Sequence, residues 1–520
     1  MSLRRVGIDI GGTFTDLILQ DTTSGQVLTH KVPSTPPDQS IGVVKGLEDI
    51  CRRAGIEPAQ IDSVVHGTTV ATNIMIEHDG AEVGMITTRG FRDILHIARH
   101  KRPHNFSLMF ELPWQAHPLV RRRNRKVVTE RVMPPDGSIE VPLVEEEVRQ
   151  AARELAEAGV EAVVVAFVYS FLNPRHEVRA KEIVLEEFPS AYVSTSTEVI
   201  PQIREYERFS TAAMNAFTGP KTARYVRNLD EKLRALGFQG QLLIMGADGG
   251  VIPPETAASQ SVQIVKSGPA GGVVGGVRCG ELAGERNFIT VDIGGTSADI
   301  SVAPEGVARI VNPRDAQVAG FPVLVPMLDI DTVGAGGGSI AYVDPGGAFR
   351  VGPKSAGADP GPACYGRGGE EPTVTDANVV LGRLDPEHFL GGELEVFPEP
   401  AARAIETKVA THLGLSVEEA ALGILRIVNN NMALSVRANS VSRGIDPRDF
   451  ALVAFGGAGP LHAVALAETV MSPCVVVPPN PGIAAAMGLL MSELRHEFPR
   501  SLLAMLTDVQ DADLKRINEQ

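Results

Sequence analysis

Cysteine is scarce in this chain of 520 residues, which has only four, Cys51, Cys279, Cys364 and Cys474. They lie far apart in the sequence, and no two form the Cys-x-x-Cys spacing of a zinc or redox site. This pattern argues against a disulfide framework and against a cysteine-based zinc centre. We therefore expect reduced thiols and a cytoplasmic protein.

Long apolar runs and an excess of positive charge are also missing. The apolar run Val160–Phe171 is well short of the roughly 20 residues that a membrane-spanning helix needs, and it predicts a buried strand instead. The formal net charge is −15, from 48 Lys and Arg against 63 Asp and Glu. An acidic surface disfavours nucleic-acid binding. We expect neither a membrane nor a nucleic acid as partner.

Glycine, by contrast, is abundant, with 53 residues, and some of it lies in a repeated octapeptide. The sequence Asp-Ile-Gly-Gly-Thr-x-x-Asp spans Asp9–Asp16 and recurs at Asp292–Asp299, each time after a short strand-like run. Paired glycines bring backbone N–H groups close to an anion because they carry no Cβ. The threonines add hydroxyl donors, and the aspartates can hold Mg²⁺ directly or through water. Two such loops predict two similar half-domains that hold one polyphosphate from opposite sides.

The similarity continues in the hairpins that follow the octapeptides. Phe14–Gln20 and Gln26–Pro33 are predicted strands in the first copy, as are Ala298–Ala303 and Val307–Asn312 in the second. An antiparallel strand directly after the glycines differs from the dinucleotide-binding pattern, in which a helix follows at once. Between the copies, helix and strand patterns over roughly Phe91–Ser261 predict an inserted α/β unit.

A basic run, Arg121–Lys126, lies in a proline- and arginine-rich stretch of this insertion. A solvated loop and a salt-bridged subunit contact are both compatible with such a run. The nearby segment His100–Phe106 is a further candidate for substrate contact, although its sequence does not indicate which group it would bind.

Late in the chain, a predicted strand at Ala451–Phe455 runs into Gly456, Gly457 and Gly459 and then into a helix. Two phosphate loops followed by this motif resemble the ATPase fold shared by actin, heat-shock chaperones and the acetate and sugar kinases. The resemblance implies an α/β fold of two actin-like, ribonuclease-H-like half-domains around an ATP cleft, with the three glycines near the adenosine. The expected units are residues 1–90 and 91–261 for the first half with its insertion, and 262–500 for the second half.

Several further segments resemble one branch of this fold, the hydantoinase A/5-oxoprolinase family of ATP-dependent ring-opening enzymes, to which ketone carboxylase subunits are related. The resemblance covers essentially the whole chain. Its matching segments are Val65–Asn73, Thr88–Asp93, Asp331–Ser339, Ser355–Gly366 and Thr373–Asn378. Family members continue beyond the position of Gln520, so we expect residues 501–520 to begin a C-terminal region that this sequence lacks.

The resemblance implies phosphorylation of the carbonyl oxygen of a cyclic amide, such as a hydantoin, 5-oxoproline or a related lactam, with ATP and Mg²⁺. A lactam carbonyl is a poor electrophile because the nitrogen lone pair is delocalised into it, and phosphorylation lets water attack. In the family, water attack belongs largely to a B-type subunit, so we expect an A-type subunit of a homo- or hetero-oligomer. A ketone carboxylase subunit and an actin-like nucleotide switch are the alternatives.

The expected site residues follow from the loops and from the resemblance. Asp9, Asp292 and His66 are the expected catalytic residues, and the two aspartates are also the expected metal ligands. Thr68, Thr69 and Asn73 are candidates for substrate binding because they lie where a strand ends and a helix begins. The expected nucleotide-binding residues are Gly11, Gly12, Thr13, Thr15, Gly294, Gly295, Thr296, Gly334, Gly336, Gly456, Gly457 and Gly459.

Other residues near these motifs serve either the ligand or the fold. The last aspartate of each octapeptide either supports the phosphate loop or caps the turn. His66 is either a catalytic residue or a hydrogen-bonded histidine of the core. No neighbouring group marks Cys364 as a nucleophile, which favours a buried thiol. The remaining residues with two interpretations, cleft lining or plain loop, are Asp329, Asp331 and Gly334–Gly338.

Overall fold

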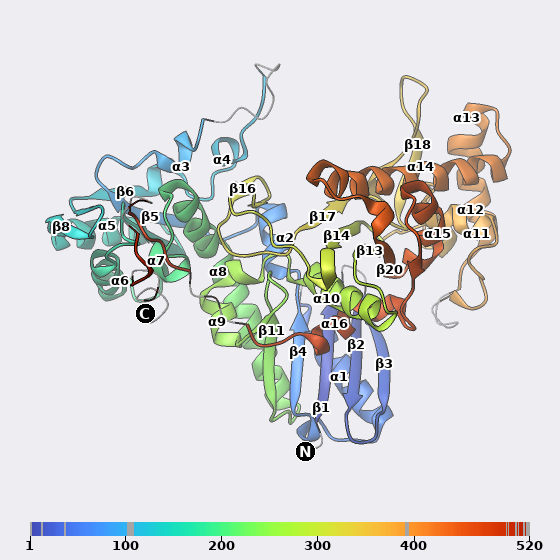
Figure 1. The fold of residues 1–520 in the computed structure, drawn as a ribbon, viewed down its shortest axis with the longest axis horizontal. Coiled ribbons are helices and arrows are strands. Elements are labelled where there is room, and N and C mark those ends of the chain that lie inside the picture. The colour runs from blue at the N-terminus through green and yellow to red at the C-terminus, as the bar shows by residue number, and fades with distance from the viewer. Residues whose placement is uncertain are drawn as a thin grey trace.

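Three sheets organise the protein in the computed structural model (Figure 1). The first sheet lies low in the centre of the view, the second at the upper right and the third at the left. The structure describes residues 3–11, 14–35, 38–100, 109–389, 395–495, 497, 499–504, 507, 509–512 and 515. Gly12 and Thr13 of the first octapeptide, and most of the candidate segment His100–Phe106, lie outside the described residues.

The first sheet has the order β3-β2-β1-β4-β11-β12, in which β1 pairs antiparallel with β2 and parallel with β4. Side chains alternate between its two faces, as a strand requires. On β2, Leu17 packs against Gly46 of helix α1, whereas Ile18 joins the cluster around Ala486 and Leu490 of helix α16. The strands are β1 Arg4–Ile10, β2 Phe14–Asp21, β3 Val27–Pro33, β4 Ser63–Gly67, β11 Gln241–Met245 and β12 Val251–Ile252.

The second sheet repeats this topology, with the order β17-β14-β13-β20-β21. Its central strand β13 pairs antiparallel with β14 and parallel with β20, as β1 does with β2 and β4. The predicted fold class, an α/β protein of two actin-like halves, is therefore confirmed. The strands are β13 Phe288–Ile293, β14 Ala298–Ala303, β17 Ile330–Val333, β20 Ala451–Phe455 and β21 Val475–Val476.

The prediction of a strand at Val307–Asn312 is wrong. The third strand of this sheet is β17, and the segment between β14 and β17 carries the small hairpin β15 (Gln317–Val318) and β16 (Phe321–Pro322). Val307 is 69% exposed and Ile310 is 38% exposed, so the segment has no apolar face to bury on the sheet. It forms only an isolated bridge between Ile310 and Leu328.

The third sheet, β10-β9-β5-β6, is parallel throughout and forms the inserted unit. Helices α5 and α6 share a core with one face, and α8 packs on the other. Its strands are β5 Val83–Thr88, β6 Arg125–Val128, β9 Ala162–Ala166 and β10 Tyr192–Thr195, with the separate hairpin β7 Arg131–Met133 and β8 Ser138–Val141. The sheet starts before residue 91, and β11 and β12 return to the first sheet; the unit boundaries stay a prediction.

Helices cover the sheets and connect the halves. Glycines let α10 and α16 pack closely: a Cβ on Gly488 would lie 1.9 Å from the Gly271 carbonyl oxygen. The helices are α1 Ser40–Ala54, α2 Val70–Glu77, α3 Ile94–Ile97, α4 Pro113–Ala116, α5 Glu145–Glu157, α6 Arg175–Glu187, α7 Ser196–Val199, α8 Glu205–Ala235, α9 Pro254–Ser259, α10 Ser267–Leu282, α11 Val374–Val380, α12 Pro398–Ile405, α13 Thr411–Leu413, α14 Val417–Asn439, α15 Gly459–Val470 and α16 Ala484–Met491. Both α10 and α16 lie where the chain crosses between the two halves, near the centre of Figure 1, above the first sheet.

Candidate nucleotide site

The two octapeptides form the same turn at equivalent places. Asp9 and Asp292 lie near the carboxyl ends of the central strands β1 and β13, and each pairs with the last aspartate of its own octapeptide. The Gly11 N–H donates to the Phe14 carbonyl over 2.9 Å, and the Gly294 N–H donates to the Ser297 carbonyl over 3.0 Å. The repeat in the sequence is thus a repeat in backbone geometry.

A glycine from the adjacent parallel strand packs against each aspartate. A Cβ on Gly67 at the end of β4 would lie 2.8 Å from Asp9 Oδ1. A Cβ on Gly456, directly after β20, would lie 2.3 Å from Asp292 Oδ1, and the φ of +83° at Gly456 also favours glycine. Both carboxylates therefore depend on a neighbour without a side chain.

Helix α10 brings the two carboxylates together. A Cβ on Gly268 would lie 3.9 Å from Asp9 Oδ1, and one on Gly272, a single turn later, would lie 3.0 Å from Asp292 Oδ2. Burial raises the pKa of Asp9 well above its ordinary value, and the negative charges of Asp16 and Asp292 add to the shift. Burial, with the charges of Asp299 and Asp16, raises the pKa of Asp292 to about 7.

These features fit a divalent cation. Asp9 Oδ1 is buried and has no hydrogen-bond partner among the described residues. Buried carboxylates of like charge repel each other, and a bound cation removes that cost. The described part of the chain holds no group of three or more His, Cys, Asp or Glu that suits a metal. The two aspartates would therefore share Mg²⁺ with phosphate and water oxygens, as this ion prefers.

The last aspartates of the octapeptides each have a partner on a neighbouring strand. Asp16 forms an ion pair with Lys31 on β3, and Asp299 accepts a hydrogen bond from Thr332 Oγ1 over 2.5 Å. Thr15 is fully buried, and its hydroxyl lies 3.3 Å from that of Ser34, which in turn donates to the Gly11 carbonyl. Thr15 is thus linked to the first loop through Ser34.

Two lysines that the motifs did not indicate face this cluster. The charge of Lys31 lowers the pKa of Asp9, Asp16 and Asp292, against the larger effect of burial. Lys266 directly precedes α10 and has a φ of +63°, and its charge acts to lower the pKa of Asp299. Neither lysine lies near an octapeptide in sequence, and only the fold brings them to it.

The glycines of the second half divide into exposed residues and buried supports. Gly295, Thr296 and Gly457 are exposed, as a ligand contact requires, and Gly459 begins α15. Gly336 is buried, and a Cβ there would lie 2.7 Å from the Ser297 nitrogen, while Gly334 packs against Pro353. The Gly337 and Gly338 N–H groups donate to the carbonyls of Gly294 and Gly295. This loop therefore holds the second phosphate loop in place.

The polar residues after β4 fall into two groups. His66 is fully buried, its Nδ1 lies 3.2 Å from the Ile8 carbonyl oxygen and its Nε2 lies 2.8 Å from the Tyr225 hydroxyl. Burial lowers the pKa of His66 to about 4. These contacts favour the core-histidine interpretation over a catalytic one. Thr68 is also buried, whereas Thr69 is partly open and Asn73 is exposed.

Three residues with two interpretations have structural partners. Asp329 forms an ion pair with Arg443, and Asp331 accepts a hydrogen bond from Ser435. Cys364 is fully buried, and its N–H donates to Asp376 Oδ1 over 2.7 Å. Burial and the charge of Asp376 raise the pKa of the Cys364 thiol, as expected for an unreactive cysteine.

Comparison with known proteins identifies the family of this chain. The model of the hydantoinase/oxoprolinase family matches residues 208–498, and that of the hydantoinase/oxoprolinase N-terminal region matches residues 5–188. Caprolactamase subunit alpha from Pseudomonas jessenii is 41% identical over 521 residues, which cover 99% of this chain and 74% of that protein. Over the described residues, no helix is long and apolar enough to cross a membrane.

Two solved structures share the whole architecture. The ATP-dependent caprolactamase from Pseudomonas jessenii superposes with a TM-score of 0.83 at 40% identity, covering 95% of this chain and 71% of that one. Nucleotide-free acetone carboxylase superposes with a TM-score of 0.82 at 30% identity, covering 100% of this chain and 74% of that one. On the family models and these relatives, the chain belongs to the hydantoinase/oxoprolinase family.

Proposed function

We propose that this protein is the phosphorylating subunit of an ATP-dependent enzyme that opens a cyclic amide. The γ-phosphoryl group of ATP moves to the carbonyl oxygen, water adds to the carbonyl carbon, and the ring C–N bond breaks. The nitrogen takes up a proton, and ADP, phosphate and a ring-opened amino acid are released. Hydantoins, 5-oxoproline and related lactams are the substrate class.

The pair Asp9 and Asp292 is the observation that carries this proposal. Each carboxylate lies beside a glycine turn of the same geometry, partial burial raises the pKa of both, and one oxygen of Asp9 has no partner among the described residues. Phosphoryl transfer needs positioning and neutralisation of charge more than covalent chemistry. Asp9 and Asp292 would hold Mg²⁺, which, when bound, supplies positive charge to the phosphate oxygens.

The chain's own groups supply the other functions. Backbone N–H groups of the exposed residues Gly295 and Thr296 would bind phosphate oxygens. Lys31 and Lys266 would balance the negative charge of the nucleotide. Approach of the two halves across the α10–α16 connection would exclude water from the transfer. Thr69 and Asn73, at the open end of β4, remain the candidates for contact with the substrate.

A second subunit of B type is part of the proposal, as is a cytoplasmic location. The relative from Pseudomonas jessenii is named as a subunit, which supports a hetero-oligomer. The likeness to acetone carboxylase supports one alternative, a ketone carboxylase subunit. Both reactions phosphorylate a carbonyl-type oxygen, so the phosphate loops favour neither. The greater identity to caprolactamase favours the cyclic amide.

Substitution of the aspartates tests the nucleotide site. Asp9→Ala or Asp292→Ala should lower nucleotide-dependent turnover at least about 100-fold, because charge stabilisation is lost where the phosphoryl group transfers. Circular dichroism should show an unchanged fold. Asp385→Ala, which removes an exposed carboxylate of the second half, is the matched control and should keep its activity. ATP turnover at the wild-type rate in either cleft variant would contradict the assignment.

A further inference from the structure

The end of strand β4 lies against the Asp9 carboxylate. A Cβ on Gly67, the last residue of β4, would lie 2.8 Å from Asp9 Oδ1 and 3.3 Å from the Leu489 side chain of α16. Gly67 thus packs closely against both. Because Asp9 Oδ1 has no hydrogen-bond partner among the described residues, its position depends on such contacts. The groups that hold the end of β4 therefore also affect where this oxygen lies.

A chain of hydrogen bonds runs from Tyr225 through His66 to the residue before Asp9. The Ile8 carbonyl can only accept, so His66 Nδ1, 3.2 Å away, carries a proton and donates to it. Burial lowers the pKa of His66 to about 4, so the ring is neutral at pH 7. Its Nε2 therefore accepts from the Tyr225 hydroxyl over 2.8 Å. Both ring nitrogens are used, and the two partners fix the tautomer of His66.

Thr68, the residue after Gly67, interacts with the same hydroxyl. Burial raises the pKa of Tyr225, and a hydrogen bond with the Thr68 side chain acts in the opposite direction. The Thr68 carbonyl accepts a hydrogen bond from Ser267 Oγ, at the start of α10, over 2.8 Å. One phenol oxygen therefore holds the residues on both sides of Gly67. Thr68 also ties this end of β4 to α10, the helix that lies against both aspartates.

Helix α8, which carries Tyr225, is itself held on both sides of that residue. Two turns after Tyr225, Lys232 forms an ion pair with Asp38 over 2.5 Å, just before α1 begins. Near the start of α8, Arg208 is fully buried and its Nη2 donates to the Phe167 carbonyl over 2.7 Å, directly after strand β9. The phenol of Tyr225 thus belongs to a helix that is fixed to the first half and to the inserted unit.

We propose that Tyr225 is a positioning residue for Asp9. Through His66 it holds the Ile8 carbonyl, which directly precedes Asp9 in the chain. Through the end of β4 it keeps Gly67 against Asp9 Oδ1, so that this oxygen stays where a cation beside the nucleotide would meet it. The inference rests on the proposed function, in which Asp9 holds Mg²⁺, and it is independent of the substrate.

Nucleotide affinity with and without Mg²⁺ tests this role without turnover, cyclic amide or partner subunit. The probe is AMPPNP, an ATP analogue that is not hydrolysed, titrated by isothermal calorimetry once in Mg²⁺ and once in EDTA. The ratio of the two affinities measures what the metal contributes. Tyr225→Phe should lower this ratio about fivefold or more, the effect of one lost hydrogen bond, and leave the affinity in EDTA unchanged. A general loss of structure would lower both affinities and leave their ratio unchanged.

Thr222→Val is the matched control. Thr222 lies one turn before Tyr225 in α8, is fully buried, and its hydroxyl has no partner among the described residues. Removing that hydroxyl costs no hydrogen bond, so the affinity ratio and the melting temperature should stay at the wild-type values. His66→Asn keeps an amide donor near the Ile8 carbonyl but does not reach Tyr225, so it should lower the ratio as Tyr225→Phe does. The double variant should be no lower than either single variant, because the two residues act as a unit.

The outcomes separate this role from the proposed reaction. If Asp9→Ala loses the Mg²⁺-dependent gain in affinity while Tyr225→Phe keeps it, the inference is overturned and the nucleotide site stands. If Tyr225→Phe loses the gain and the wild type opens no cyclic amide, the positioning role stands and the proposed reaction fails. A wild-type protein without any Mg²⁺-dependent gain would overturn both the metal site and the role of Tyr225.

Discussion

Lys266 has a left-handed backbone conformation, with a φ of +63°, that favours glycine. A residue with a Cβ costs about 1 kcal/mol there, so the side chain is retained for another reason. Its charge acts on Asp299 of the second octapeptide, and Lys266 forms no ion pair with a described residue. Lys266 is therefore suited to face a phosphate.

Replacing Lys266 by glycine removes the backbone strain and the positive charge together, and the two losses act on different measurements: strain on stability and charge on ATP binding. Lys266→Gly should leave the melting temperature equal or slightly higher, and should lower ATP-dependent turnover and ATP affinity about tenfold or more. Glu305→Gly is the matched control, because Glu305 is exposed and has a φ of +53° in the turn after β14, away from the cleft. If both variants kept full ATP affinity, Lys266 would have no role at the nucleotide.

Asp292 links stability to pH. Its pKa is raised to about 7 in the folded protein against 3.8 in the unfolded chain, so the folded state holds the proton more tightly. Stability should therefore fall as pH rises from about 4 to 7, by up to about 4 kcal/mol at about 1.4 kcal/mol per pKa unit. Asp292→Asn should melt at a higher temperature than the wild type at pH 8, with the difference vanishing near pH 4.

Thermal unfolding over this pH range, with and without Mg²⁺, measures the effect. Added Mg²⁺ with nucleotide should stabilise the wild type at pH 8 more than the variant, because the variant has lost one of the two carboxylates proposed to bind the cation. Asp385→Asn, which changes an exposed carboxylate, should leave the pH dependence as it is. A wild-type protein whose stability rises between pH 5 and pH 7 in the same way as the variant would contradict buried, proton-binding aspartates.

The repeated octapeptide indicates Asp9 and Asp292 as site residues, but the sequence does not indicate which lysines lie near them. Lys31 reaches Asp16 because the two residues pair across β2 and β3, and Lys266 reaches the cleft because α10 begins there. His66 belongs to a matching family segment, yet its neighbours Ile8 and Tyr225 occupy both ring nitrogens. Packing between distant segments decides which side of a strand faces the ligand, and a single sequence does not show that packing.

At the scale of helices and strands, turn residues and apolar alternation predicted an element correctly where the packing of the folded protein buries the same side chains. The hairpin β2–β3 agrees closely with its prediction. The strand predicted at Val307–Asn312 does not form, and its place beside β14 is taken by β17, which lies farther along the chain. The pair Gly219-Pro220 favours a helix that begins at Gly219, but α8 begins at Glu205 and continues through Pro220. Its first half is buried nearly all round, and a Cβ on Gly219 would lie 2.3 Å from the Tyr192 ring, so packing overrides the helix-breaking pair.

The contact between α10 and α16 should tolerate no side chain at its centre. Gly488→Ala would place a Cβ 1.9 Å from the Gly271 carbonyl oxygen, a backbone atom that cannot move aside cheaply. We expect a loss of about 3 kcal/mol or more in the free energy of unfolding, measured by urea denaturation. Gly482→Ala, two residues before α16 begins, meets open space and should be neutral. Equal stability of the two variants would show that the helices are not packed this closely.

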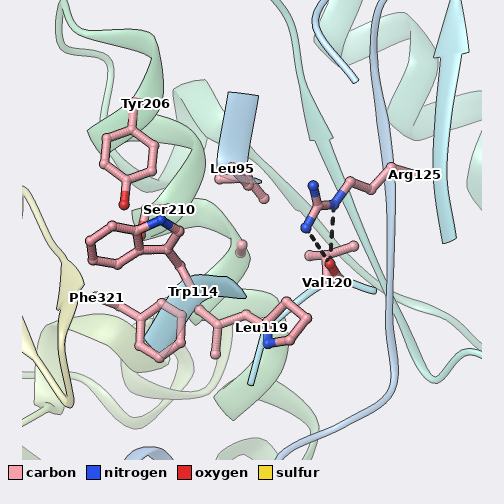
Figure 2. Close-up of a pocket in the computed structure, with 10 residues that line it drawn as sticks. Leu95, Trp114, Leu119, Val120, Arg125, Tyr206, Ser210 and Phe321 are labelled. Atoms are coloured by element: carbon pink, nitrogen blue, oxygen red, sulfur yellow. Dashed lines mark hydrogen bonds between the residues drawn. The ribbon is translucent and has the colours of Figure 1, made fainter. Parts of the chain in front are cut away.

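At the scale of the whole molecule, the repeat in sequence became a repeat in topology. Each half places its aspartate at the end of a central strand, and α10 lies against both. The insertion with its parallel sheet adds a small closed pocket beside Arg125 and Trp114 (Figure 2), and its contact with the β15–β16 hairpin links it to the second half.

The most direct test of the account is the stoichiometry of ATP use during ring opening. The chain and a B-type partner would be incubated with Mg-ATP and, in separate reactions, caprolactam, hydantoin, 5-oxoproline, and acetone with bicarbonate. We predict one ADP and one phosphate for each ring-opened amino acid, with turnover lost in Asp292→Ala. ADP formation that depends only on acetone and bicarbonate, with no cyclic amide opened, would contradict the central claim and assign the protein to the ketone carboxylases.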